Sequence, residues 1–300
     1  MQRLFLIILL LSAPILAQAK LRLFACEPEW AALAHEIAGD KVKTDSGTTA
    51  LQDPHYIQAR PSLIAKVRRA DLVVCSGAQL EIGWLPMLLR KANNHEAQPG
   101  TRGFMYASDF VRRLEIPTSV DRIQGDMHPQ GNPHVQTNPH NIARIAKALS
   151  QRMQELDAGN ATAYQAGLDD FLKRWNAAML RWEKRAASLR GKRVITHHKS
   201  WIYLEDWLGM KEVANLEPKP GIPPTASHLS ALLRQLGTEG QGADLIIRTA
   251  YQNEKPSEWL SKRTKIRDVM LPFTVGGSDT AVDLFSLFDD TLDRLLGAGQ

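Results

Sequence analysis

Short apolar runs alternate with amphipathic stretches along this chain, and the pattern predicts strands that alternate with helices. The first half reads as strands at 21–26, near 42, at 71–75 and at 103–107, with helices at 29–38, 61–70 and 81–92. Later strands are expected at 192–196, 243–247 and 268–271, and a last amphipathic helix at 282–296. Because βα alternation is typical of parallel, doubly wound sheets, we expect one such sheet in each half.

The stretch between the two halves, residues 141–189, is helical throughout. A break at Ala158-Gly159-Asn160 leaves one helix of about 28 residues after it, longer than most helices of globular domains. We interpret this helix as a rigid strut. The predicted fold is therefore α/β, with two lobes, each with a parallel βα sheet, joined by a long backbone helix. The predicted boundaries are 20–158, 159–190 and 191–300.

The first 19 residues have the pattern of a secretory signal peptide. Arg3 precedes an apolar run from Leu4 to Leu11, and Ala17-Gln18-Ala19 matches a cleavage site. The alternative is a membrane anchor, but a spanning helix needs about 20 apolar residues, and Pro14 interrupts this shorter stretch. We expect cleavage after Ala19 and export of the rest, with no cysteine at the cleavage site for a lipid anchor.

Composition excludes several classes of protein. The 300 residues are 44% apolar and 23% charged, which is typical of a globular chain rather than a disordered or multi-span membrane protein. The formal charge is only +5, and the basic residues are scattered, so we expect no nucleic-acid partner.

The two cysteines, Cys26 and Cys75, each end an apolar run that reads as a strand. Cysteines of an exported protein mature in an oxidising compartment, which favours a disulfide bond between them. If the two strands are parallel neighbours, both sulfurs lie at the same edge of the sheet. Two buried free thiols remain the alternative, because cysteine is commonly a small buried apolar residue.

Three of the nine histidines have distinctive sequence contexts. His55 follows Asp53-Pro54, His134 follows Asn132-Pro133, and His198 comes directly after a predicted strand and His197. Ligands of α/β proteins collect at the carboxyl ends of strands, and neutral imidazoles from separate loops are typical Zn²⁺ ligands. A single histidine near a turn is more often a solvated or capping residue, and no local zinc motif such as H-E-x-x-H is present. These residues indicate a metal site without establishing one.

Five groups of residues occur in a fixed order along the chain. They are Asp53-Pro54-His55 with Arg60-Pro61-Ser62, Ala70-Asp71-Leu72 with residues 76–81, Asn132-Pro133-His134-Val135 with Asn138-Pro139, Thr196-His197-His198 with Tyr203, and Pro220-Gly221-Ile222-Pro223-Pro224. In these motifs the chain resembles the solute-binding proteins of zinc and manganese ABC importers, a periplasmic metal-binding family, and its zinc branch in particular. The resemblance covers nearly the whole chain after residue 20.

The resemblance implies that His55, His134 and His198 are the metal ligands, with His197 as the register alternative to His198. It also implies a periplasmic monomer that delivers its ion to the membrane permease of an ABC importer. Three histidines favour Zn²⁺ over Mn²⁺ as the transported ion, because manganese prefers oxygen ligands. Binding should weaken below about pH 6.5, where free imidazole protonates. The remaining histidines are expected to be structural or on the surface: His35, His95, His128, His140 and His228.

The chain departs from the family pattern in two places. It has no long loop rich in histidine and acids before the second ligand, so we expect no accessory capture of metal there. The family's carboxylate ligand after the last strand is replaced by Leu271-Pro272-Phe273. Asp279, a water molecule or another carboxylate could supply the fourth ligand. Asp279 could equally cap the last helix, a role that aspartate commonly fills.

Two rival functions fit parts of the same pattern. Three histidines with an open fourth position are also the arrangement of a secreted zinc hydrolase. Such an enzyme needs a general base, and Glu81 is the candidate, although its place between a strand and a helix suggests that it braces the helix instead. The other rival is a metal chaperone or adhesin that uses the same fold without a permease. We expect no enzymatic activity.

Overall fold

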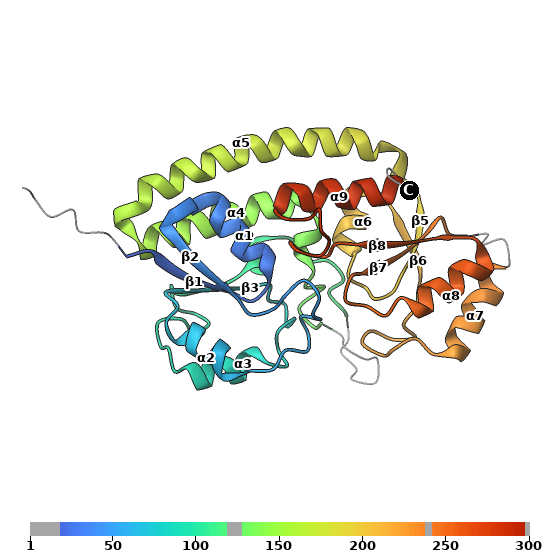
Figure 1. The fold of residues 1–300 in the computed structure, drawn as a ribbon, viewed down its shortest axis with the longest axis horizontal. Helices are drawn as coiled ribbons and strands as arrows, with labels where there is room; N and C mark the ends of the chain where they lie inside the picture. The colour runs from blue at the N-terminus through green and yellow to red at the C-terminus, as the bar shows by residue number, and fades with distance from the viewer. Residues whose placement is uncertain (1–18, 119–127, 238–241, 298–300) are drawn as a thin grey trace, which may run out of the picture.

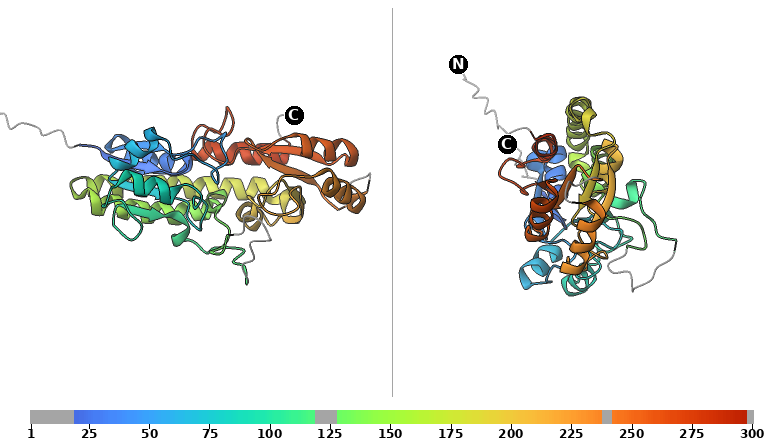
Figure 2. Two further views of the ribbon diagram at one scale, coloured as in Figure 1. Left: turned by 90° about the horizontal axis from the view of Figure 1, so that it is seen from below. Right: turned by 90° about the vertical axis from the view of Figure 1, so that its right-hand side faces the viewer.

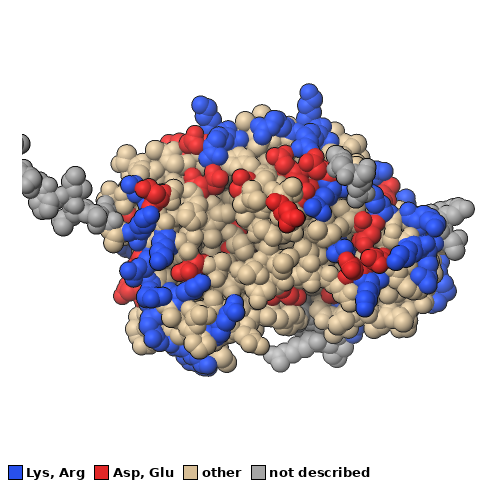
Figure 3. Space-filling view, in the orientation of Figure 1, with Lys and Arg blue, Asp and Glu red and all other residues tan. Residues whose placement is uncertain are grey.

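The computed structural model describes residues 19–118, 128–237 and 242–297 (Figure 1). The predicted signal peptide lies outside these residues, apart from Ala19. Within them, no helix combines the length and the apolar character that crossing a bilayer requires. Charged residues of both signs alternate around the rim of the face seen in Figure 3, in keeping with the small net charge.

The first lobe contains a four-stranded parallel sheet in the order β2-β1-β3-β4. Its elements are β1 (Leu21–Ala25), α1 (Pro28–Ala38), β2 (Val42–Ser46), α2 (Pro61–Arg68), β3 (Leu72–Cys75), α3 (Leu85–Ala92) and β4 (Phe104–Tyr106). Side chains alternate between the two faces of β1, so Leu23 joins the core cluster that includes α1 and Phe24 the one that includes α2 and α3. This sheet is therefore buried on both faces, as parallel sheets usually are.

The second lobe repeats this arrangement, with strand order β6-β5-β7-β8 and all strands parallel. Its elements are β5 (Arg193–Thr196), α6 (Ile202–Leu208), β6 (Lys211–Asn215), α7 (Ala226–Leu236), β7 (Leu245–Thr249), α8 (Lys255–Thr264), β8 (Arg267–Leu271) and α9 (Leu284–Leu296). The predicted fold class, two parallel α/β lobes, is confirmed.

Two helices connect the lobes. Helix α4 (Pro139–Leu156) is followed by a 3₁₀ turn at Ala158–Asn160 and by α5 (Ala161–Arg185), which lies along one side of both lobes in Figure 1 and Figure 2. Gly167 allows α5 to pack closely on α1, because a β-carbon there would lie 1.9 Å from the Ile37 carbonyl oxygen. Further along α5, Trp182 stacks on Phe288 of α9 at 5.1 Å between ring centroids. Because α5 packs on both lobes, the long helix is confirmed as the predicted strut.

Two predicted helix boundaries are wrong. Helix α3 begins at Leu85 instead of residue 81, because the chain first makes a turn in which Gly77, Ala78 and Gln79 all have positive φ. A side chain at position 77 would collide with Ser108 and Tyr106. The cap of α9 is Asp283, whose carboxylate accepts a hydrogen bond from the Ser286 amide, and not Asp279.

Candidate metal centre

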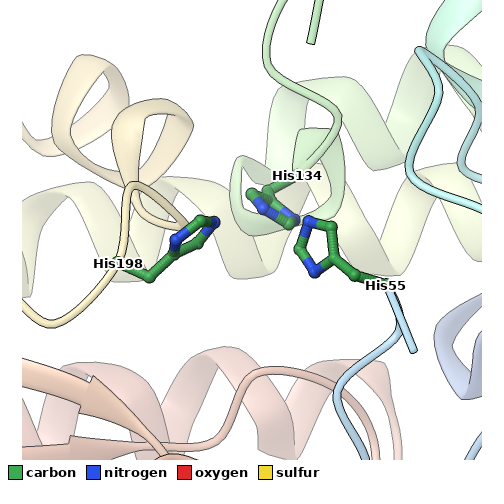
Figure 4. A group of neighbouring side chains, drawn as sticks. All are labelled: His55, His134 and His198. Atoms are coloured by element: carbon green, nitrogen blue, oxygen red, sulfur yellow. The ribbon is translucent and has the colours of Figure 1, made fainter. Parts of the chain in front are cut away.

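The three predicted ligands come together although they lie on distant loops. His55 follows β2, His134 lies between β4 and α4, and His198 follows β5. One side-chain nitrogen from each of them falls in a group whose members all lie within 4.8 Å of one another. Figure 4 shows the three rings directed toward a common point. The carboxyl ends of strands from both lobes therefore contribute to one cluster, which we call the histidine cluster.

Carboxylates orient two rings of the cluster. The Nδ1 atom of His55 lies 2.7 Å from Asp53, and the Nδ1 atom of His198 lies 2.7 Å from Glu217. A carboxylate only accepts hydrogen bonds, so each Nδ1 donates and the ring's lone pair lies on Nε2, the nitrogen that would bind a metal ion. Burial alone would raise the pKa of Asp53, but its hydrogen bonds with His55 hold that pKa below the ordinary value.

His134 is fully buried, and neither of its ring nitrogens has a hydrogen-bond partner. Buried polar atoms are normally satisfied, and an exception requires an explanation, such as a bound ion. Burial, together with His55, His198 and His128, lowers the pKa of His134 well below its ordinary value. This imidazole is therefore neutral, the form that binds metal, at neutral pH.

The loops that carry His134 and His198 are hydrogen-bonded to each other across the lobes. The Asn132 side chain donates to the Lys199 carbonyl at 2.8 Å and accepts from the His134 amide at 3.1 Å. The Tyr203 hydroxyl donates to the Asn132 carbonyl at 2.8 Å. These hydrogen bonds link the His134 loop directly to the His198 loop, so they restrict how far the predicted ligands of the two lobes can separate.

Most of the remaining histidines lie outside the cluster, as predicted. His35 contacts Thr44, His140 pairs with Glu183, His228 bonds to the Asn215 carbonyl, and His95 is exposed. His197 is buried, and burial lowers its pKa to about 4. The cluster contains His198 and not His197.

His128 is also outside the group formed by His55, His134 and His198, as predicted, but it lies directly beside that group. Its Nε2 lies 3.4 Å from the Nε2 of His55, and its ring centroid lies 6.3 Å from that of His134. Burial, with His55 and His198 nearby, lowers the pKa of His128 to about 3. Pro129 follows His128 instead of preceding it, unlike the prolines before His55 and His134, and the contact with His55 spans 73 positions.

Asp279, the carboxylate considered as fourth ligand, is exposed and is not in the histidine cluster. The segment after β8 instead brings Phe273 beside His134, at 5.3 Å between ring centroids. Among the described residues, no carboxylate oxygen joins the three histidines within the 4.8 Å limit. The donors gathered here are nitrogens.

A second group of acids, which we call the carboxyl cluster, is buried in the first lobe. Glu27, Glu29 and Glu81 are each at most 4% exposed. Glu81 accepts hydrogen bonds from the Gly77 amide at 3.2 Å and is grouped with the two cysteines rather than with the histidines. It therefore braces the turn before α3, as the sequence suggested, and is not placed as a general base beside the histidine cluster.

We expect the carboxyl cluster to make stability depend on pH. Burial raises the pKa of Glu81 from 4.5 to about 7, so the folded chain holds this proton more tightly than the unfolded chain does. That stabilisation is complete below pH 4.5 and is lost as the pH rises through 7. The melting temperature of the metal-free protein should fall by a few degrees between pH 6.5 and 8. The melting temperature of Glu81→Gln should fall less over this pH range, whereas that of Glu96→Gln, at an exposed position, should fall as the wild type's does. An equal fall in melting temperature for Glu81→Gln and the wild type would contradict the argument.

The family of the chain can now be assigned. A family model described as ZnuA, the periplasmic component A of a zinc-uptake complex, matches residues 24–298. The chain belongs to this family of periplasmic metal-binding receptors. A structure titled "Crystal structure of ZnuA" superposes with a TM-score of 0.77 at 20% identity, covering 94% of this chain and all of that one. That likeness establishes the shared fold.

Curated relatives are named for metal transport. The manganese ABC transporter substrate-binding lipoprotein PsaA of Streptococcus pneumoniae (strain TIGR4) is 27% identical over 283 residues, 91% of this chain and 81% of PsaA. The metal ABC transporter substrate-binding lipoprotein SsaB of Streptococcus sanguinis is 26% identical over 162 residues, 53% of this chain. The matched part spans about half the length of SsaB.

Proposed function

We propose that this protein is the periplasmic zinc receptor of an ABC-type importer. It captures Zn²⁺ between its lobes at His55, His134 and His198 and passes the ion to a membrane permease. The exported form begins after Ala19 and acts as a monomer. The observation that carries the proposal is the histidine cluster, in which two imidazoles are oriented by carboxylates and the third is buried without a partner.

The donors favour zinc over manganese. Zn²⁺ binds imidazole nitrogen in tetrahedral sites, whereas Mn²⁺ prefers carboxylate, carbonyl and water oxygens. In this chain Asp53 and Glu217 are engaged by the Nδ1 atoms of His55 and His198, and Asp279 is exposed and outside the cluster. PsaA is named for manganese, whereas the family model is named for zinc, so membership of the family does not by itself determine which metal is bound.

The geometry also suggests how capture and delivery are coupled. His55 and His134 belong to the first lobe and His198 to the second, so small movements of the lobes change the distances between the donors. Helix α5 packs on both lobes and limits such movements. Zn²⁺ would hold the lobes together, and release to the permease would require them to separate slightly.

A competition titration tests the zinc assignment. Purified metal-free protein should bind one Zn²⁺ ion, and a hundredfold excess of Mn²⁺ should not displace it. A manganese affinity within tenfold of that for zinc would refute the assignment. A strain without this gene should grow poorly in zinc-depleted medium and recover when zinc is added; unchanged zinc uptake would favour the chaperone or adhesin instead.

A further inference from the structure

We infer that His128 is the fourth zinc ligand and closes a four-histidine site. This inference rests on the proposed function, because it concerns the same ion. In a tetrahedral site with Zn–N bonds of 2.0 to 2.1 Å, neighbouring ligand nitrogens lie about 3.4 Å apart. The Nε2 atoms of His55 and His128 lie 3.4 Å apart, the length of one edge of such a tetrahedron.

His128 lies between the histidine cluster and two surface cavities. Its ring centroid lies 5.4 Å from that of His55, and the two rings are tilted by 31°. His128 lines a cavity of about 590 Å³ together with His198, and it lines another of about 440 Å³ together with His55. It thus borders two cavities that each reach one histidine of the cluster, and it is partly exposed whereas His134 is fully buried.

Neither His128 nor a carboxylate belongs to the described group of atoms within 4.8 Å, so a fourth donor has to move toward the other three, and the carboxylates beside the histidines are already engaged. The carboxylates of Asp53 and Glu217 accept hydrogen bonds from the Nδ1 atoms of His55 and His198. The segment after β8 supplies the ring of Phe273, which is buried against His134 and Trp201. Because the segment after β8 supplies no donor atom, His128 from the first lobe would occupy the fourth coordination position.

The chemical consequence is selectivity. Four imidazoles give Zn²⁺ a complete tetrahedral shell of nitrogen, and they leave no protein oxygen for Mn²⁺. A site with three histidines and one water molecule would instead keep one coordination position at which the water can be replaced by another ligand. His128 would thus both increase zinc affinity and separate zinc from manganese.

Replacement of His128 tests this role. His128→Ala should lower zinc affinity by about 10- to 100-fold, by comparison with the losses that follow removal of outer-shell partners. His128→Asp, which offers an oxygen, should recover part of the affinity and raise the relative affinity for Mn²⁺. His95→Ala, the matched control at an exposed position of the same lobe, should bind as the wild type does.

A spectroscopic measurement gives a second readout. The Co²⁺-loaded wild type should show the strong visible bands of a tetrahedral site, and His128→Ala should shift them as water replaces imidazole. Unchanged zinc affinity and an unchanged cobalt spectrum in His128→Ala would overturn the role of His128 while leaving the receptor function intact. Failure of the wild type to bind zinc would overturn the proposed function itself.

Discussion

Replacing His134 with alanine should reduce zinc affinity by about 1000-fold or more, beyond the 10- to 100-fold typical of losing an outer-shell partner. His134 is fully buried at the inner end of the site, and both of its ring nitrogens lack protein partners. Its lowered pKa keeps it neutral, so no proton has to leave before the metal binds. A water molecule in its place would lie in a pocket walled by Phe273, whose ring offers it no hydrogen bond.

Calorimetric titration of the metal-free variant measures this loss. His140→Ala is the matched control, because His140 pairs with Glu183 on the surface and stands outside the cluster. Circular dichroism and the melting temperature without metal should show that both variants fold. Zinc binding by His134→Ala within tenfold of the wild type would show that the ion binds elsewhere.

The strands that are buried on both faces of their sheet could be predicted from the sequence. β3 and β7 contain short runs of consecutive apolar residues, and such runs can be recognised in the sequence without the structure. β6 was not predicted, because Lys211, Glu212 and Asn215 give it a polar pattern. It is an edge strand, and side-chain oxygens of Glu212 and Asn215 accept hydrogen bonds from the Thr196 hydroxyl of the neighbouring strand. Such partners become evident only when the strands are paired.

The candidate site shows the same limit. His55, His134 and His198 were found because each has a local context, either a preceding proline or the end of a strand, and motif order supported all three. No proline precedes His128 and no predicted strand ends there, and its place beside His55 depends on contacts across 73 positions. Asp279 failed for the opposite reason: its sequence position suits a ligand, but the turn at Gly276 and Gly277 leaves it in solvent.

The pairing of the cysteines was left open by the sequence and is settled by the sheet. β1 and β3 are parallel neighbours, and Cys26 and Cys75 form a disulfide bond at their carboxyl ends. The bond encloses the loop that carries His55 and Asp53. It therefore connects the stability of the first lobe to the segment that supplies one of the proposed ligands.

Breaking this disulfide bond should destabilise the metal-free protein by about 2 to 4 kcal/mol, because a cross-link between residues 49 positions apart restricts the unfolded chain. Both cysteines are fully buried, and replacing them with alanine removes the two sulfur atoms without placing a polar or charged group in the core. At about 2 to 4 °C per kcal/mol, the melting temperature of Cys26→Ala/Cys75→Ala should fall by about 5 to 15 °C.

Zinc should offset much of this loss. An ion that binds only the folded chain stabilises it by RT ln(1 + [L]/Kd), about 4 kcal/mol at a thousandfold excess over Kd. The double alanine variant should therefore melt near the metal-free wild type once zinc is added, and the wild type reduced with a phosphine should behave as the variant does. A variant that melts with the metal-free wild type before zinc is added would show that the bond does not stabilise the lobe. A variant that folds but gains nothing from zinc would show that the bond holds the His55 loop in its binding position.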